Sequence, residues 1–195
     1  MNKIKTLTVF CGSSNGSNPQ YLKGAEELGK ELYTRGITLV YGGGNLGLMG
    51  QIAKTLFSLG GTVIGILPKD MNIPEITSER VETERIIVSN IHERKQKMYE
   101  LGDAFMALPG GIGTFEELLE IYTWYQLGYH KKPIGVFNLE GYYDSLILQL
   151  RHAEIEGFIK KECVEKLFID NDSSYLLDKM IRADLSIGPL YRQFT

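Results

Sequence analysis

The chain has 195 residues, of which 43% are hydrophobic and 23% are charged, and its formal net charge is −3. This length is sufficient for one well-buried core but short for two, so we expect residues 1–195 to form a single domain. The weakly acidic balance provides no global positive field of the kind that nucleic-acid binding usually needs. We therefore expect no nucleic-acid partner, and we expect an acidic substrate to be bound by a few well-placed groups.

Cysteine and histidine usage indicates a reduced, cytoplasmic protein without a metal site. Cys11 and Cys163 lie far apart in the sequence and outside any C-x-x-C spacing. The three histidines form neither an H-x-x-x-H motif nor a Cys/His cluster, which argues against zinc. The apolar run Leu7–Cys11 is too short for a signal peptide, and no segment approaches the roughly 18 apolar residues of a membrane span.

Short apolar runs alternate with amphipathic segments along the chain. The pattern predicts strands at Ile4–Cys11, Ile37–Tyr41, Gly61–Leu67, Arg85–Val88, Ala104–Leu108, Pro133–Asn138 and Leu167–Ile169. It predicts helices at Gln20–Arg35, from Gly50 to Leu59, at Ile91–Leu101, from Thr114 onward, and at Tyr142–Glu156 and Ser174–Ala183. Met71–Glu84 is polar, contains proline and is expected to be a loop over the site. Nearly continuous apolar strands alternating with helices are typical of a doubly wound α/β fold, a parallel sheet with helices on both faces.

Three glycine-rich loops follow predicted strands, so they should open on the edge of the sheet where such folds bind ligands. Gly12–Gly16 matches the G-x-S-x-G nucleophile elbow, but it follows the first strand and has no upstream loop for an oxyanion hole. We interpret it as a polar turn in which Ser13 contacts a phosphate or sugar, with plain loop chemistry as an equal alternative. Gly42–Gly50 lacks the dinucleotide fingerprint. Its Gly43 and Gly44 are either ligand contacts through backbone amides or part of a tight turn only.

The stretch Asp103–Gln126 carries the strongest functional signal. A buried strand runs into the glycine turn Pro109–Gly113 and then into a helix that we expect Thr114 to open. Glycines let backbone N–H groups approach a ligand, and the free N–H groups and dipole of a helix N-terminus favour an anion. We therefore predict that the turn holds a 5′-phosphate and that Glu117 is a catalytic carboxylate. The alternative is that Thr114-x-x-Glu117 is a capping box, in which Glu117 only closes the helix.

Arg94 and Lys95 follow a predicted helix cap at Ser89 or Asn90. They therefore lie near the positive end of their helix, where exposed cations are unfavourable by ~0.3–1 kcal/mol each. An acidic ligand or Glu117 would relieve this, and arginine suits bidentate contacts. A solvated basic surface is the ordinary alternative.

These motifs together resemble one known family. Pro109–Glu117 reads P-G-G-x-G-T-x-x-E, Arg94-Lys95 precedes it, and Gly12-Ser13-Ser14 and Tyr41–Gly44 complete the pattern. The chain is similar over nearly its whole length to the Lonely guy family, cytokinin riboside 5′-monophosphate phosphoribohydrolases that were long mislabelled as lysine decarboxylases. The resemblance implies a Rossmann-like homodimer that needs no metal or redox cofactor. It also implies hydrolysis of the N-glycosidic bond of a purine nucleoside 5′-monophosphate, either a cytokinin riboside or an adenosine derivative, to base and ribose 5-phosphate.

The resemblance implies that Arg94 and Glu117 are the catalytic pair and that Glu75 binds substrate, although Glu75 is otherwise an ordinary loop acid. With the loop interpretations above, the remaining expected substrate contacts are Ser13, Gly43, Gly44, Lys95, Gly110, Gly111, Ile112, Gly113, Thr114, Phe115, Glu116 and Thr123. Cleavage of a glycosidic C–N bond passes through an oxocarbenium-like state. We hypothesise that Glu117 stabilises that state and orients or deprotonates water, while Arg94 holds the ribose or phosphate.

Other functions are compatible with the same sequence features. A non-catalytic carrier or sensor of a phosphorylated nucleotide or pterin would use the same glycines and Arg94. A flavin-binding module would use the Ser13–Ser17 loop. A lysine decarboxylase would need a Schiff-base lysine, for which Lys54 and Lys69 are only candidates.

The predicted helix after the glycine turn is unusually aromatic. Tyr122, Trp124, Tyr125 and the nearby Tyr129 give it more aromatic surface than a single core face needs. The surplus is either a subunit contact or is buried under a neighbouring helix.

Overall fold

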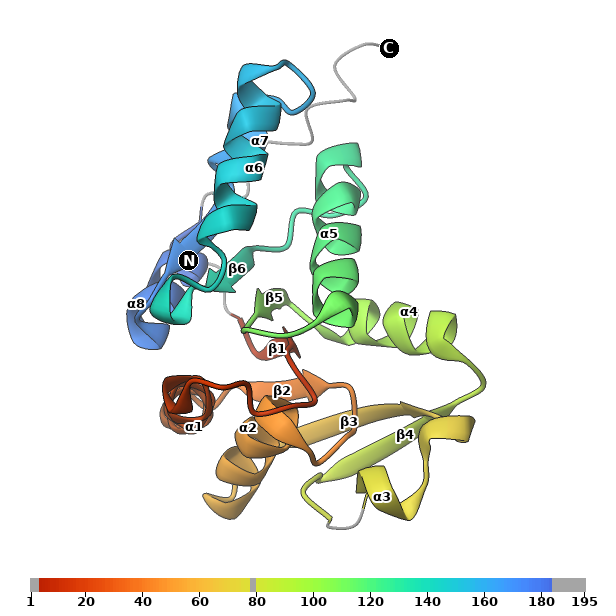
Figure 1. Ribbon diagram of the computed structural model, residues 1–195. Helices are drawn as coiled ribbons and strands as arrows, with labels where there is room; N and C mark the ends of the chain where they lie inside the picture. Colours follow the sequence, from red (N-terminus) through yellow and green to blue (C-terminus); the bar gives the residue numbers. More distant parts are fainter. Residues whose placement is uncertain (1–3, 78–79, 184–195) are drawn as a thin grey trace.

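A computed structural model describes residues 4–77 and 80–183, which form a seven-stranded parallel sheet with helices on both faces (Figure 1). The strands are β1 (Thr6–Phe10), β2 (Thr38–Tyr41), β3 (Val63–Pro68), β4 (Glu84–Val88), β5 (Ala104–Ala107), β6 (Ile134–Phe137) and β7 (Leu167–Asp170). The α-helices are α1 (Pro19–Arg35), α2 (Gly47–Ser58), α3 (Pro74–Thr77), α4 (Ile91–Leu101), α5 (Ile112–Leu127), α6 (Asp144–Ile155), α7 (Lys161–Val164) and α8 (Ser173–Ile181). Two short 3-10 turns are η1 (Lys69–Met71) and η2 (Leu139–Gly141). The predicted α/β class is confirmed.

The strand order is β4-β3-β2-β1-β5-β6-β7, so the chain builds outward from β1 to β4 and then returns to the other side of β1. The reversal lies between β1 and β5, whose parallel register runs from Leu7 opposite Ala104 to Phe10 opposite Ala107. Loops that leave the carboxyl ends of strands on either side of such a reversal diverge and leave a crevice between them. The loops after β1 and β5 are therefore the natural walls of a ligand site.

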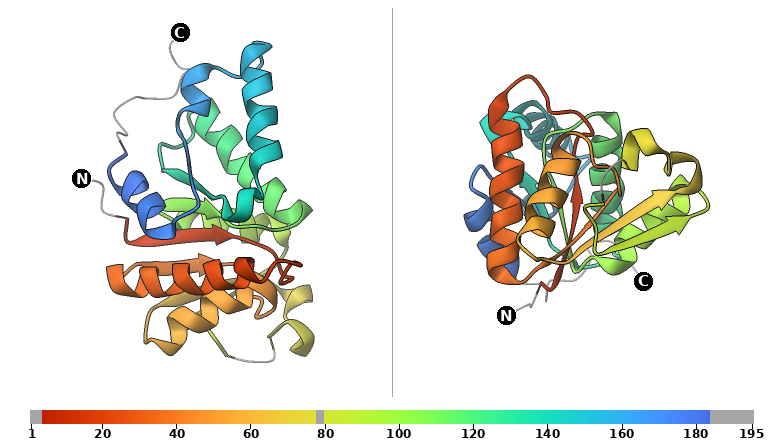
Figure 2. Two further views of the ribbon diagram at one scale, coloured as in Figure 1. Left: turned by 60° about the vertical axis from the view of Figure 1, so that its left-hand side comes forward. Right: turned by 90° about the horizontal axis from the view of Figure 1, so that it is seen from below.

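Each face of the sheet has its own apolar layer, because strand side chains alternate between faces. On one face, Leu39 of β2 packs with residues of α1, α2 and α8, including Leu28 and Leu176. On the other face, Val40 packs with residues of α4, α5 and α6, including Leu118. Figure 2 shows α1 and α2 lying side by side. Strands buried on both faces explain the nearly continuous apolar runs in the sequence.

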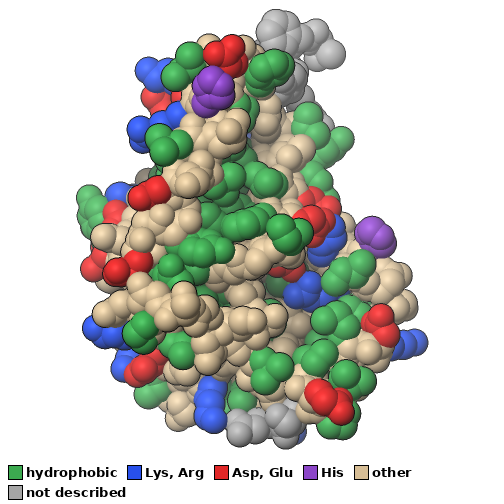
Figure 3. Space-filling model, viewed as in Figure 1, with side chains coloured by type: hydrophobic (Ala, Val, Ile, Leu, Met, Phe, Trp, Pro, Cys, Tyr) green, Lys and Arg blue, Asp and Glu red, His purple; other side chains and the backbone are tan. Residues whose placement is uncertain are grey.

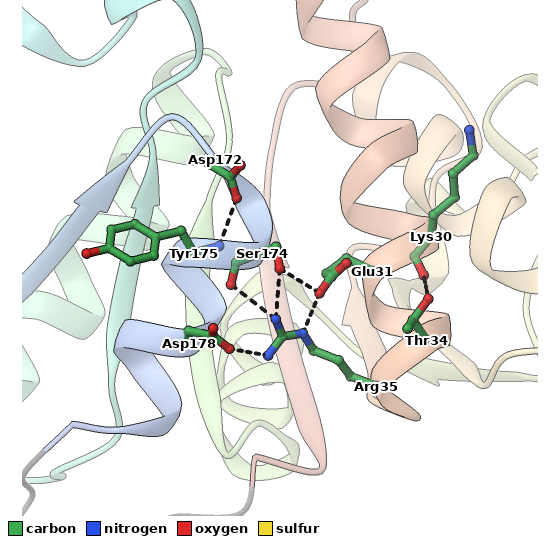
Figure 4. A network of polar contacts seen from close by, with 8 residues as sticks. All are labelled: Lys30, Glu31, Thr34, Arg35, Asp172, Ser174, Tyr175 and Asp178. Carbon is green, nitrogen blue, oxygen red and sulfur yellow. Dashed lines mark hydrogen bonds and ion pairs between the residues drawn. The ribbon is translucent and has the colours of Figure 1, made fainter.

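Arg35, in the last turn of α1, links α1 to α8 through hydrogen bonds and ion pairs (Figure 4). Its Nε donates to Oε1 of Glu31 at 2.6 Å and its Nη1 to Oδ1 of Asp178 at 2.7 Å. Its Nη2 donates to the carbonyl oxygen of Ser174 at 3.2 Å, and the Ser174 hydroxyl donates to Glu31 at 3.0 Å. One guanidinium thus joins α1 to α8.

Three expectations about elements were wrong. Met71–Glu84 is not entirely a loop, because it contains the one-turn helix α3; positions 78 and 79 lie outside the described residues. Helix α7 was not predicted, because one helical turn is too short to show a periodic apolar pattern. Helix α5 begins at Ile112 with Gly111 at its N-cap, so Thr114 does not open it.

We predict that Arg35→Gln lowers the melting temperature by about 2–4 °C, the shift that a loss of about 1 kcal/mol gives in a chain of this size. The reason is that glutamine cannot contact α1 and α8 at the same time. Differential scanning calorimetry measures the change. Lys23→Gln is the matched control, because the 3.7 Å pair of Lys23 with Glu27 is exposed and should contribute nothing measurable. Equal melting temperatures for the two variants would contradict the role of Arg35.

Candidate active site

The glycine turn after β5 presents only hydrogen-bond donors. Four consecutive carbonyl oxygens are occupied: Leu108 by the Tyr143 hydroxyl (2.6 Å), Pro109 by the Gly12 N–H (3.0 Å), Gly110 by the Tyr142 hydroxyl, and Gly111 by the Phe115 N–H (3.1 Å). By contrast, the N–H groups of residues 110–114 have no acceptor among the residues that the structure describes. A group of free N–H donors at a helix N-terminus suits an anion.

The capping-box interpretation of this turn was wrong. Helix α5 has Gly111 at its N-cap, and no side chain caps it. Thr114 lies inside the first turn and is buried, and Glu117 bonds to another helix instead of returning to the backbone. A Cβ at Gly110 would lie 2.1 Å from the Thr114 hydroxyl oxygen and 2.8 Å from the Gly12 nitrogen, so only glycine fits there.

A cavity of about 300 Å³ lies between the loops that follow β1 and β5. Its lining residues are Gly12, Ser13, Ser14, Asn15, Gly16, Tyr21, Leu48, Pro109, Gly110, Gly111 and Tyr142. The structure therefore brings the expected site residues Ser13, Gly110 and Gly111 together at the topological reversal. Tyr21 and Tyr142 were missed, because no local sequence pattern indicates that they approach these loops.

Arg94 of α4 and Glu117 of α5 form a buried ion pair, and neither residue lines the cavity between the loops after β1 and β5. Nη1 of Arg94 donates to Oε1 of Glu117 at 2.8 Å, and the two residues are only 9% and 8% exposed. The predicted cap by Asn90 is confirmed: its side chain accepts from the N–H of Glu93 and places Arg94 in the first turns of α4. A Cβ at Gly42 would lie 2.1 Å from Nη2 of Arg94, so the glycine after β2 gives the guanidinium its space.

The Arg94–Glu117 pair has an unused hydrogen-bond donor, and the pKa of its carboxyl group is shifted. Nε of Arg94 is buried and has no hydrogen-bond partner within the described part of the chain. Burial raises the pKa of Glu117 above its ordinary value, while the Arg94 charge opposes that rise. A carboxyl group with a raised pKa can exchange a proton closer to neutral pH, as a general base or acid requires.

A second set of charges joins α4 to α5. The Lys95 ammonium group donates to Glu116 and, at 2.9 Å, to Glu120. Figure 3 shows acidic and basic side chains gathered near the start of α5, beside α4. The unfavourable position of Lys95 at its helix N-terminus is thus relieved by carboxylates of α5. Burial and these partners act in opposite directions on the pKa of Lys95, and the net result is a rise.

The remaining expected contacts are distributed around this centre. The Asn45 N–H donates to the Ile76 carbonyl oxygen at 3.0 Å, so α3 closes onto the loop that carries Gly43 and Gly44. Glu75 is exposed on α3, next to that loop. The other expected contacts on α5 are Ile112, Gly113 and Phe115 in its first turn and Thr123 farther along. The Thr123 hydroxyl donates to the Leu119 carbonyl oxygen of its own helix at 2.7 Å.

In residues 4–77 and 80–183, no group of three or more His, Cys, Asp or Glu side chains could hold a metal ion. No helix in those ranges is long and apolar enough to cross a membrane.

Known proteins resemble this chain in sequence and in fold. A family model described as "Possible lysine decarboxylase" matches residues 49–180. The chain is 46% identical to "Probable cytokinin riboside 5'-monophosphate phosphoribohydrolase LOGL3" of Oryza sativa subsp. japonica, over 92% of this chain and 84% of that protein. It is 52% identical to "Cytokinin riboside 5'-monophosphate phosphoribohydrolase LOG1" of Arabidopsis thaliana, over 81% of this chain and 74% of that protein.

Solved structures share the fold at low sequence identity. The molybdenum cofactor binding protein from Rippkaea orientalis superposes with a TM-score of 0.67 at 20% identity, covering 90% of this chain and 94% of that one. The molybdenum cofactor carrier protein from Chlamydomonas reinhardtii gives 0.64 at 20% identity, covering 90% and 96%. At these identities the likeness concerns the fold alone.

We predict that the pKa of Glu117 lies above the ordinary glutamate value of 4.5. Infrared difference titration of the native protein against Glu117→Gln, which removes this carboxyl band, measures it. Because the Arg94 charge favours the carboxylate, Arg94→Gln should raise the pKa of Glu117 further. Glu93 is an internal control, because its hydrogen bond from the Ser89 N–H lowers its pKa below 4.5. A Glu117 pKa at or below that of Glu93 would contradict the burial argument.

Proposed function

The chain belongs to the LOG family of cytokinin riboside 5′-monophosphate phosphoribohydrolases, and we propose that Arg94 and Glu117 carry out its reaction beside the turn that follows β5. It is a hydrolase that cleaves the N-glycosidic bond of a cytokinin riboside 5′-monophosphate, which yields the free base and ribose 5-phosphate. The observation that carries the residue assignment is the buried Arg94–Glu117 pair, which lies beside the start of α5, where the turn presents free N–H groups. The proposal includes AMP as a substrate, because AMP has the same phosphate, ribose and purine.

The phosphate anchor comes first in the proposed mechanism. The N–H groups of Gly110–Thr114 and the positive end of the α5 dipole bind the 5′-phosphate. Ser13 approaches from the facing loop, since it lines the same cavity. The phosphate does not react, so its binding energy serves to align the sugar with Glu117.

Glu117 acts at the anomeric carbon. As the C–N bond breaks, positive charge develops on the sugar, and a carboxylate held in a water-poor site stabilises it. The same carboxylate takes a proton from the attacking water, a role that its raised pKa favours. Arg94 holds that carboxylate through Nη1, which leaves its unpartnered Nε for a ribose hydroxyl.

Lys95, Glu116, Glu75 and Thr123 are proposed as outer contacts. The Lys95 side chain is 13% exposed, whereas that of Glu116 is 51% exposed. For Lys95 to contact the substrate, an acidic group of the ligand must replace one of the two carboxylates bound to Lys95. We expect it to replace Glu116, which is more exposed than Glu120. Glu75 is included because α3, which carries it, is bonded to the glycine loop after β2 through the Asn45 N–H and the Ile76 carbonyl oxygen.

We propose a homodimer, in which α6 lies at the subunit contact. No residue of α6 is fully buried, and Leu148, Ile155 and the nearby Phe158 are 65%, 79% and 80% exposed. A helix with this much uncovered apolar surface is suited to an isologous contact with a second copy. Part of the aromatic surplus at α5 is covered by a neighbouring helix, because Trp124 packs edge-on against Tyr99 of α4 with ring centroids 4.9 Å apart, whereas Tyr129 is 67% exposed.

The reduced cytoplasm is the proposed compartment. Both cysteines are free and buried. Buried thiols without a partner suit a reducing environment, in which a stabilising disulfide is not expected.

Two other functions make different predictions. A lysine decarboxylase needs a lysine enclosed with its cofactor, but Lys54 and Lys69 are both exposed and neither lines the cavity. A carrier of a phosphorylated nucleotide or pterin would bind at the same turn and release no base. Release of adenine from AMP, followed by chromatography, separates the enzyme from the carrier.

We expect Glu117→Gln to lower kcat for adenine release from AMP by about 10²–10⁴-fold, the usual contribution of a general acid or base. Glutamine keeps the size of the side chain but can neither accept a proton nor carry the negative charge. The affinity for ribose 5-phosphate, measured by calorimetry, should stay within a few-fold of native, because the turn is untouched. Glu100→Gln, an exposed change in the last turn of α4, is the control. Near-native turnover by Glu117→Gln would remove the carboxylate from the mechanism.

Leu148→Asp tests the subunit contact. We expect it to convert a dimer into a monomer, because an uncompensated charge at a buried apolar contact is unfavourable. Size-exclusion chromatography with light scattering measures the mass, and Lys23→Asp on α1 is the control. A monomeric native protein, or a Leu148→Asp variant that remains dimeric, would rule out this interface.

A further inference from the structure

Two adjacent tyrosines from the turn between β6 and α6 reach the glycine turn after β5. The Tyr143 hydroxyl donates to the carbonyl oxygen of Leu108, and the Tyr142 hydroxyl donates to that of Gly110. These carbonyls flank Pro109. The two hydroxyl groups therefore hold the beginning of the turn on either side of Pro109, from a segment more than thirty residues away in the sequence.

The tyrosines are themselves held in place. The side-chain oxygen of Asn138 accepts the Tyr143 N–H at 2.7 Å, and its amide nitrogen donates to Asp144 at 2.7 Å. Burial raises the pKa of Tyr143, which keeps its hydroxyl protonated as a donor. The Tyr142 ring packs edge-on against Tyr21 with centroids 5.7 Å apart, and both rings line the cavity.

Holding a carbonyl fixes the N–H group that follows it. The peptide unit is planar and trans, so its C=O and N–H point in opposite directions. The bond from Tyr142 to the Gly110 carbonyl therefore fixes the direction of the Gly111 N–H, just as the bond from Gly12 to Pro109 fixes that of the Gly110 N–H. Glycine has little intrinsic preference for one backbone conformation, so without these bonds the unit between Gly110 and Gly111 could rotate and turn its oxygen toward an anion.

We propose that Tyr142 is a positioning residue for the substrate phosphate: its hydroxyl group holds the peptide unit between Gly110 and Gly111 in the one arrangement that presents an N–H group, and no carbonyl oxygen, to the anion. Tyr143 supports the same turn from the carbonyl oxygen of Leu108, but Pro109 has no N–H group for it to orient. The inference rests on the proposed function in one respect, that the anion at this turn is the 5′-phosphate of the substrate. Neither tyrosine takes part in bond breaking. Their contribution is therefore to affinity for the phosphorylated end.

The test uses Tyr142→Phe, which removes the hydroxyl and keeps the ring. Calorimetry with ribose 5-phosphate and with inorganic phosphate should give Kd values about tenfold weaker than native, equivalent to about 1.4 kcal/mol. KM for AMP should rise by a similar factor, with kcat unchanged within about twofold. Tyr143→Phe should weaken phosphate binding less than Tyr142→Phe, because the Leu108–Pro109 peptide unit has no N–H group, and the double variant should bind at least as weakly as Tyr142→Phe.

Tyr122→Phe is the matched control. Its hydroxyl lies on α5 itself and is buried without a hydrogen-bond partner among the described residues, so its removal should leave phosphate affinity and KM unchanged. Native melting temperatures with a weaker phosphate Kd for Tyr142→Phe separate positioning from general destabilisation. Unchanged Kd values for Tyr142→Phe and the double variant, or a fall in kcat at constant KM, would overturn the proposal. If native protein binds ribose 5-phosphate but releases no base from AMP or from a cytokinin riboside 5′-monophosphate, the proposed function fails while the calorimetric comparison still decides this inference.

Discussion

The site depends on a helix that begins without a side-chain cap. Helices α1, α4 and α8 start with Asn18, Asn90 and Asp172, whose side chains accept a first-turn N–H. Helix α5 has Gly111 in that place and no side-chain cap. A serine or aspartate there would stabilise the helix relative to glycine by only about a few tenths of a kcal/mol, and it would occupy N–H groups that an anion needs. Helices α2, α6 and α7 also lack a side-chain cap, so what distinguishes α5 is that its uncapped start lies beside the reversal of strand order, where the donors stay available to a ligand.

The buried ion pair follows a different constraint. Removing Arg94 and Glu117 from water is unfavourable unless they pair well, and replacing such a pair with apolar residues is often neutral or stabilising. The pair is also incompletely satisfied, because Nε of Arg94 has no partner in the described ranges. The guanidinium of Arg94 also requires a glycine at position 42, because any side chain there would overlap it. Burying two charges and leaving one N–H donor without a partner is energetically unfavourable. Such an arrangement is better explained by ligand binding than by a contribution to the stability of the fold.

Local sequence patterns predicted the features that depend on neighbouring residues in the sequence, and they failed where a tertiary contact decides. The apolar strand runs predicted the sheet, and the motifs singled out Arg94 and Glu117, which the structure brings together in a buried ion pair at the centre of the proposed site. Thr114-x-x-Glu117 misled because it satisfies a local capping rule, while the tertiary bond from Arg94 takes the glutamate away. Tyr142 could not be found, because the bond to Gly110 joins segments that only the fold brings together.

Helix α5 sets the distance between the phosphate anchor and the reacting group. Its free N–H groups lie in the first turn, and Glu117 lies five positions after Ile112, roughly 7.5 Å along the axis at 1.5 Å per residue. Both groups belong to one rigid element, so their separation does not depend on loop motion. What can vary is the position of Arg94, which comes from α4. The bonds from Lys95 to Glu116 and Glu120 oppose sliding of α4 against α5 and so keep the guanidinium beside the carboxylate that it orients. We therefore propose different roles for the two adjacent cations of α4: Lys95 keeps α4 and α5 aligned, and Arg94 acts at the site.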